Sequence, residues 1–93
     1  MTVRVFVSPR AKAEIDEIET YLEEYSPAAA ARFLGALTRA FQILTEHPDR
    51  GAAGMRPGTR RLVIGDYIAS YRRHREEVEI FAVRHARRGN ARF

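Results

Sequence analysis

The chain has 93 residues, 45% hydrophobic and 30% charged, so it is expected to form one domain (1–93) around one small core and does not have a disordered composition. It contains no cysteine, three scattered histidines and no apolar run long enough for a signal peptide or a membrane span. These features argue against a disulfide framework and a metal site, and they favour a cytoplasmic protein. The net charge is +4, and residues 47–93 carry 11 basic and 5 acidic side chains.

A strand followed by an amphipathic helix is predicted at the N-terminus. Residues 2–7 (TVRVFV) alternate β-branched and aromatic side chains, which favours a strand. Ser8 and Pro9 then provide an N-cap and a proline at the first helical position. The apolar stripe that follows has helical spacing and consists of Ala11, Ile15, Ile18, Leu22 and Tyr25.

A second helix is predicted to follow almost without a linker. Ser26 and Pro27 repeat the start signal, so the two helices must fold back as a hairpin. The helix is expected to end before Pro48. Its wide apolar stripe consists of Ala30, Leu34, Leu37, Phe41 and Leu44, broadened by Phe33, Ala40 and Ile43.

The second half predicts a loop and three strands. Residues 51–58 (GAAGMRPG) read as a loop, and residues 60–64, 67–74 and 77–85 read as strands. Gly65-Asp66 is a two-residue turn with glycine first, and a second turn is expected near Arg75-Glu76. Strict alternation would place Val78, Ile80 and Ala82 on one face of the last strand, and Phe81 and Val83 on the other.

The predicted fold class is therefore α+β. It has an N-terminal strand, an antiparallel two-helix hairpin and a three-stranded antiparallel meander, which form one small sheet packed on the hairpin.

In this order and spacing, several short motifs resemble one known family. They are His47-Pro48 with Gly51, Arg61-Leu62 with Gly65 and Tyr67, Tyr71, Val78 with Ile80, and Val83 with His85 and Arg88. From Val3 to about Arg88 the chain is similar to the RelE/ParE superfamily of toxins from bacterial type II toxin-antitoxin systems. Its long hairpin and VRHARR ending look more like the ParE branch, whose members inhibit DNA gyrase, than the RelE branch, whose members cleave messenger RNA on the ribosome.

The ParE-like resemblance implies a non-enzymatic gyrase inhibitor that is neutralised by a cognate ParD-like antitoxin, with no cofactor, metal or membrane partner. Nucleic acid would be contacted only through the target. The expected target-binding residues are Arg84, His85, Arg87, Arg88 and Arg92, and residues 89–93 are expected to form a flexible tail. The expected antitoxin-binding residues are Leu22, Tyr25, Phe33, Leu37, Arg61, Tyr67 and Tyr71.

Two alternatives remain open at the level of sequence. A RelE-like ribonuclease would need an acid, a base and positive charge at the scissile phosphate, and its residues would be His85, Arg84, Arg87 and Arg61, with Glu79 nearby. Arginine can supply only the charge, and no tyrosine follows Tyr71. The other alternative is an inactive toxin-like module that only binds a partner.

Overall fold

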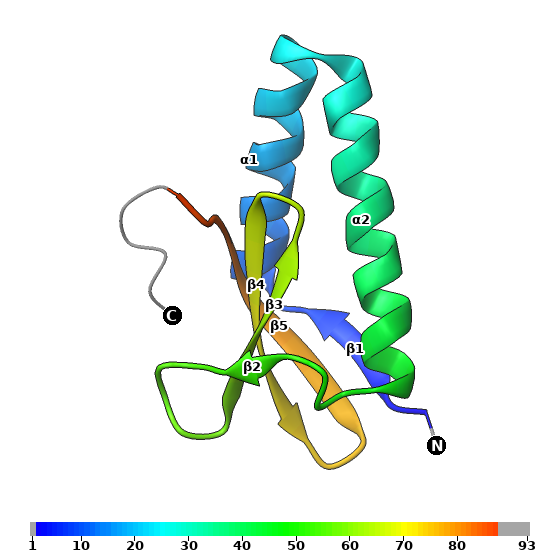
Figure 1. Cartoon of the computed structure of the whole chain (residues 1–93), viewed down its shortest axis with the longest axis vertical. Coiled ribbons are helices and arrows are strands. Elements are labelled where there is room, and N and C mark those ends of the chain that lie inside the picture. Colours follow the sequence, from blue (N-terminus) through cyan, green and yellow to red (C-terminus); the bar gives the residue numbers. More distant parts are fainter. Residues whose placement is uncertain (1, 88–93) are drawn as a thin grey trace.

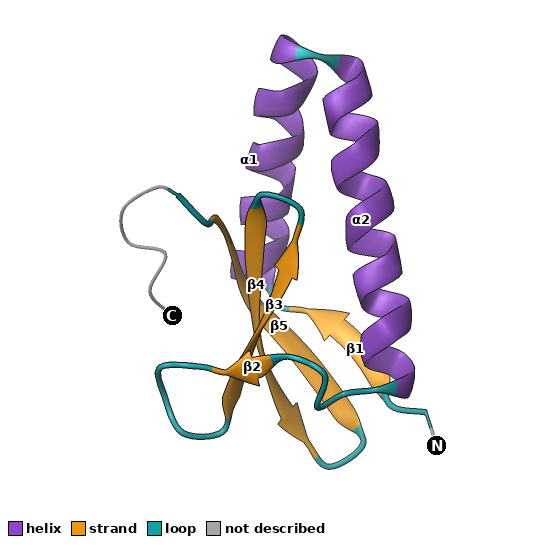
Figure 2. Ribbon diagram, viewed as in Figure 1, coloured by secondary structure: helices purple, strands orange, loops and turns teal. Residues whose placement is uncertain are grey.

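A computed structural model describes residues 2–87, which form two helices and one five-stranded sheet (Figures 1 and 2). The predicted tail 89–93, Arg88 and Arg92 lie outside the described residues. The helices are α1 (Pro9–Tyr25) and α2 (Pro27–Glu46), and the strands are β1 (Arg4–Val7), β2 (Ala52–Ala53), β3 (Thr59–Ile64), β4 (Tyr67–His74) and β5 (Glu77–His85). The α+β class is confirmed.

Both helices begin where the sequence predicts. The Ser8 hydroxyl accepts the amide hydrogen of Ala11 at 3.1 Å, and the Ser26 hydroxyl accepts that of Ala29 at 3.2 Å. Each serine is followed by a proline in the first turn, where the missing N–H costs nothing. Ser26 ends α1 and begins α2, so the hairpin has almost no loop, and its tip projects beyond the sheet in Figure 1.

The sheet has the order β1-β5-β4-β3-β2. The antiparallel meander β3-β4-β5 is confirmed, and its first turn has Gly65 at φ +61°, as a glycine-first turn requires. The sequence did not predict that β1 pairs in parallel with β5. The prediction of a plain loop at 51–58 was wrong in part, because Ala52 and Ala53 pair with β3 as the two-residue strand β2.

A bulge in β5 overturns the predicted alternation. Tyr71 pairs with Ile80 but its neighbour Ser70 pairs with Ala82, so Phe81 is the extra residue. The shift returns Val83 to the core face with Ile80, and it places Ala82 with Ser70 on the other face. The prediction that Ala82 shares a face with Val78 and Ile80, opposite Val83, was therefore wrong.

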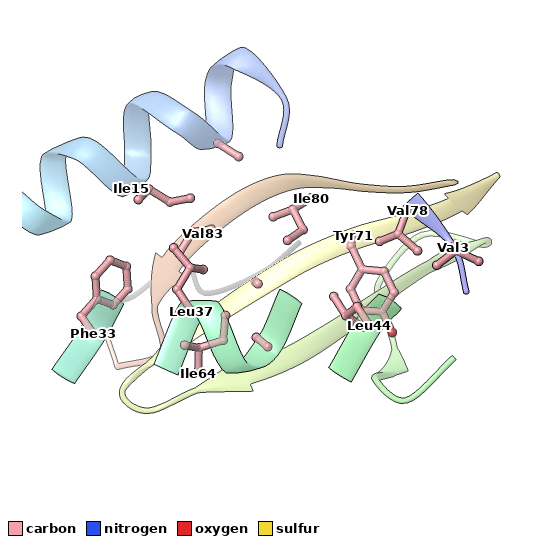
Figure 3. Close-up of a cluster of buried hydrophobic side chains, with 13 residues drawn as sticks. Val3, Ile15, Phe33, Leu37, Leu44, Ile64, Tyr71, Val78, Ile80 and Val83 are labelled. Carbon is pink, nitrogen blue, oxygen red and sulfur yellow. The ribbon is translucent and has the colours of Figure 1, made fainter. Parts of the chain in front are cut away.

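The core lies between the helical hairpin and one face of the sheet (Figure 3). Leu37 and Leu44 from α2 meet Tyr71, Ile80 and other strand residues there. Two residues of the predicted apolar stripes are exposed, Tyr25 at 76% and Leu34 at 36%. Periodicity identifies an apolar stripe, but it does not show that the hairpin tip extends past the sheet that would cover Tyr25.

Candidate functional site

The hairpin groove is a depression of ≈ 670 Å³ between the two helices and the β3-β4 turn. Leu22, Phe33 and Tyr67 contribute apolar surface to its lining. Arg32 and Arg39 from α2 also line it, and among the described residues neither guanidinium forms an ion pair. The groove thus combines an apolar surface with two arginines and one carboxylate, that of Asp66, and this excess of positive charge suits an amphipathic segment with acidic side chains.

An aromatic row crosses this groove. The Phe33 and Tyr67 rings meet edge to face with centroids 5.0 Å apart, and the Tyr67 and His85 rings do so at 5.2 Å. His85 is the last residue of β5, and its Nδ1 accepts the amide hydrogen of Arg87 at 3.1 Å. This contact orients the His85 ring at the strand end.

The predicted antitoxin-binding residues fall into three groups. Leu22, Phe33 and Tyr67 line the hairpin groove, and Tyr25 stands exposed beside Tyr21 with ring centroids 5.2 Å apart. Leu37 and Tyr71 are buried in the core, where their packing gives them a structural role. Arg61 lies on the sheet face opposite the helices, called the open face, together with Arg4, Ser70, Arg72, Glu77, Glu79 and Arg84.

The three predicted target-binding residues that the structure describes do not share one surface. His85 faces the hairpin groove, whereas the neighbouring Arg84 extends from the open face. The Arg84 Nε lies 3.5 Å from Glu14 Oε2, so this arginine already has a carboxylate partner. Arg87 is exposed in the turn after β5.

In the ribonuclease alternative, two of the arginines are likewise separated from His85, whereas Arg87 follows it in the adjacent turn. Arg61 and Arg84 lie on the open face and His85 on the helix-facing side. Glu79, the nearby carboxylate of that set, lies 3.4 Å from Arg72 Nε. In the part of the chain that the structure describes, the sheet therefore does not bring His85 together with these arginines around one phosphate position.

Sequence reasoning missed the polar contacts that hold the site's scaffold. The Tyr71 hydroxyl accepts the amide hydrogen of Gly51 at 2.9 Å, inside the core. Burial raises the pKa of Tyr71, and the Gly51 hydrogen bond and Arg60 oppose this only in part. Asp49 joins the same corner, because its carboxylate lies 3.1 Å from Arg73 Nη1 and 3.7 Å from Arg60 Nε. These partners are distant in sequence, so no local sequence pattern predicts their contacts.

Within residues 2–87, no three His, Asp or Glu side chains are arranged to hold a metal ion. No helix in this range has the length and apolarity needed to cross a membrane.

Comparison with known proteins identifies close relatives. The family model for the ParE toxin of the type II toxin-antitoxin system parDE matches residues 5–89. Putative toxin Y4kP of Sinorhizobium fredii is 43% identical over 79 residues, which cover 83% of this chain and 81% of that protein. Toxin RelE1 of Caulobacter vibrioides is 36% identical over 89 residues (91% and 95%), and toxin ParE1 of the same organism is 35% identical over 69 residues (71% and 72%).

Solved structures share the fold. A chain from the chromosomal ParDE system of P. aeruginosa matches with a TM-score of 0.73 and 20% identity, covering 90% of this chain and 96% of that one. A chain from the RelBE2 toxin-antitoxin complex of Mycobacterium tuberculosis matches with a TM-score of 0.67 and 22% identity, covering 91% and 99%.

Proposed function

This chain belongs to the ParE toxin family of type II toxin-antitoxin systems, and we propose that it inhibits DNA gyrase and is neutralised by a cognate ParD-like antitoxin. It acts in the cytoplasm, where its target is, and it catalyses no reaction itself. Inhibition of this kind needs a surface that binds one state of the target better than the others, and it needs no reactive group.

The separation of His85 from Arg61 and Arg84 is the observation that carries this proposal. Phosphodiester cleavage requires proton transfer and charge stabilisation around one phosphate, whereas these groups lie on two faces of the sheet. The proposed target-binding residues then lie around the end of β5, with Arg84 on the open face, His85 on the helix-facing side and Arg87 in the following turn, and Arg88 and Arg92 lie beyond the described residues. The arginines among them would meet acidic protein surface or phosphates of the gyrase-bound DNA.

The hairpin groove is the proposed antitoxin site. It holds three residues of the predicted antitoxin surface, Leu22, Phe33 and Tyr67, and it also contains His85. An antitoxin segment in this groove would cover His85 directly, so binding and neutralisation would be one event. Two of the structural relatives come from a ParDE system and a RelBE2 toxin-antitoxin complex, which supports a partner of this kind.

A gyrase assay tests the proposal. Purified protein is added to gyrase and plasmid DNA, and supercoiling and cleaved DNA are measured with and without the product of the neighbouring antitoxin gene. We expect supercoiling to fall, cleaved complexes to accumulate, and antitoxin to reverse both effects. Full supercoiling activity and no cleaved DNA at high molar excess would refute the gyrase target.

A RelE-like messenger RNA endonuclease is the second candidate, favoured by relatives that carry the RelE name. It predicts cut messages on translating ribosomes. Substitution of His85 or Arg84 by alanine would then abolish both the cuts and the translation block.

A further inference from the structure

Ser70 and Arg61 form an incomplete polar pair on the open face. Ser70 is only 1% exposed, and its hydroxyl oxygen has no hydrogen-bond partner among the described residues. Arg61 of β3 lies directly opposite Ser70 of β4 in the antiparallel register, so the two side chains are neighbours on the same face. A buried hydroxyl without a partner is costly, and such groups often mark a position that something else completes.

Arg61 also lacks a carboxylate partner within the described residues. The other arginines of the open face have carboxylate partners: Arg4 lies 3.6 Å from Glu77, Arg72 lies 3.4 Å from Glu79, and Arg84 pairs with Glu14. Within residues 2–87 Arg61 forms no ion pair and no side-chain hydrogen bond. Its long side chain can therefore swing away from Ser70 without breaking a polar contact.

The two groups complement a single oxyanion. A guanidinium donates two parallel hydrogen bonds to a carboxylate, and a neighbouring hydroxyl can donate a third. Arg4, Arg72 and Arg84 each have a carboxylate partner, so a nucleic-acid strand with a charge at every phosphate would meet only one unpaired guanidinium among the described residues of this face. One carboxylate, delivered by one side chain, matches this single cation.

We propose that Arg61 and Ser70 form a receptor for one carboxylate from an aspartate or glutamate side chain of a protein partner. The hydroxyl of Ser70 donates to one carboxylate oxygen, and the guanidinium of Arg61 holds the carboxylate from β3. Under the proposed function, that partner is the acidic segment of the antitoxin after it has crossed from the hairpin groove to the open face. Only the identity of this partner rests on the function proposed above, and the chemistry of the receptor does not.

The receptor can be tested on the isolated protein. The Nε–Hε signals of the arginines are followed by NMR while a capped tripeptide with one central glutamate is added, and a glutamine tripeptide and a short single-stranded RNA serve as parallel probes. We expect a saturable shift of the Arg61 signal with the glutamate peptide alone. The signals of Arg72 and Arg84 are internal controls and should shift little, because these arginines already form ion pairs with Glu79 and Glu14.

Ser70→Ala separates a receptor from a structural residue. The variant should bind the glutamate peptide about 10-fold more weakly, as for a lost hydrogen bond to a charged group, while its thermal midpoint stays the same or rises. Unchanged affinity in Ser70→Ala, equal shifts at all three arginines, or a stronger response to RNA would each overturn the proposal. No gyrase or antitoxin is present, so these results do not depend on the function assigned above.

Discussion

Glu14 of α1 accepts the amide hydrogen of Val83 at 2.9 Å, on a part of the β5 edge that no strand within residues 2–87 covers. The parallel partner strand β1 ends at Val7, opposite Ile80. Beyond that point, no strand in the described part of the chain forms backbone hydrogen bonds with this edge of β5. One carboxylate takes the place of the missing strand, and it also lies 3.5 Å from Arg10 and from Arg84. The contact fixes the strand end that carries His85.

Glu14→Ala should destabilise the fold. The Val83 N–H would lose its acceptor in a partly buried position, which costs about 1–3 kcal/mol. Glu14→Gln is the matched control, because its amide oxygen can still accept that hydrogen bond. Urea denaturation and hydrogen exchange at Val83 measure the effect, and equal losses in the two variants would show that the ion pairs, and not the hydrogen bond, hold the edge.

Stability should decrease at alkaline pH because of Tyr71. Burial raises the pKa of this phenol, whereas in the unfolded chain it ionises near its ordinary value of about 10. Above that pH the unfolded state has lost a proton that the folded state keeps, so the free energy of unfolding falls by up to about 1.4 kcal/mol per pH unit until the folded-state pKa is reached.

Tyr71→Phe should weaken this pH dependence. At neutral pH the variant should lose about 1–2 kcal/mol, because Gly51 then has an amide hydrogen without an acceptor. Denaturation curves of both proteins from pH 7 to 11 provide the comparison. A variant with the same alkaline slope as the parent chain would contradict the assignment to Tyr71.

Much of the fold follows from local sequence signals. The Ser8-Pro9 and Ser26-Pro27 pairs predicted both helix starts, and the turn at Gly65 predicted the first hairpin of the meander. In each case the signal and the structure that it specifies lie within a few residues, because caps and tight turns are made by the backbone next to them.

The structural features that the sequence did not predict depend on contacts between residues that are distant in sequence. The bulge at Phe81 exchanges the faces of Ala82 and Val83, and it arises from pairing with β4. The hydrogen bond from Val83 to Glu14 spans 69 positions. For the site, the sequence selected Leu22, Phe33 and Tyr67, which line the hairpin groove. It also grouped Arg84 with His85, although neighbouring residues of a strand point to opposite faces of the sheet.

Substitution by alanine should lower the stability of the fold at Gly51 and raise it at Gly35. A Cβ at Gly51 would lie 2.5 Å from the carbonyl oxygen of Arg61 and 2.8 Å from the Tyr71 hydroxyl, so Gly51→Ala should cost about 1–3 kcal/mol or more. Gly35 lies inside α2 with its nearest neighbour at 3.6 Å, so Gly35→Ala should add about 0.5–1 kcal/mol. Thermal denaturation of the two variants decides the matter, and a tolerated Gly51→Ala would contradict the tight approach of the loop to Tyr71.

The charge of the hairpin groove should control antitoxin binding. Arg32→Glu combined with Arg39→Glu should weaken binding at least about 10-fold, chiefly by slowing association, because both arginines line the groove without ion-pair partners among the described residues. Arg50→Glu combined with Arg56→Glu is the control for net charge, because both arginines are exposed, neither lines the groove, and the charge changes by the same amount. Binding kinetics at two salt concentrations would measure the effect, and equal losses in the double variant and the control would place the antitoxin elsewhere.

Gyrase inhibition without RNA cleavage can be measured in one experiment with two arms. Purified protein is divided between a gyrase reaction with plasmid DNA and a translating extract with a labelled message. We expect cleaved gyrase–DNA complexes in the first arm, reversible by antitoxin, and intact message in the second. Cleaved message, together with undiminished supercoiling at high molar excess, would show that the protein is a ribonuclease and not a gyrase inhibitor.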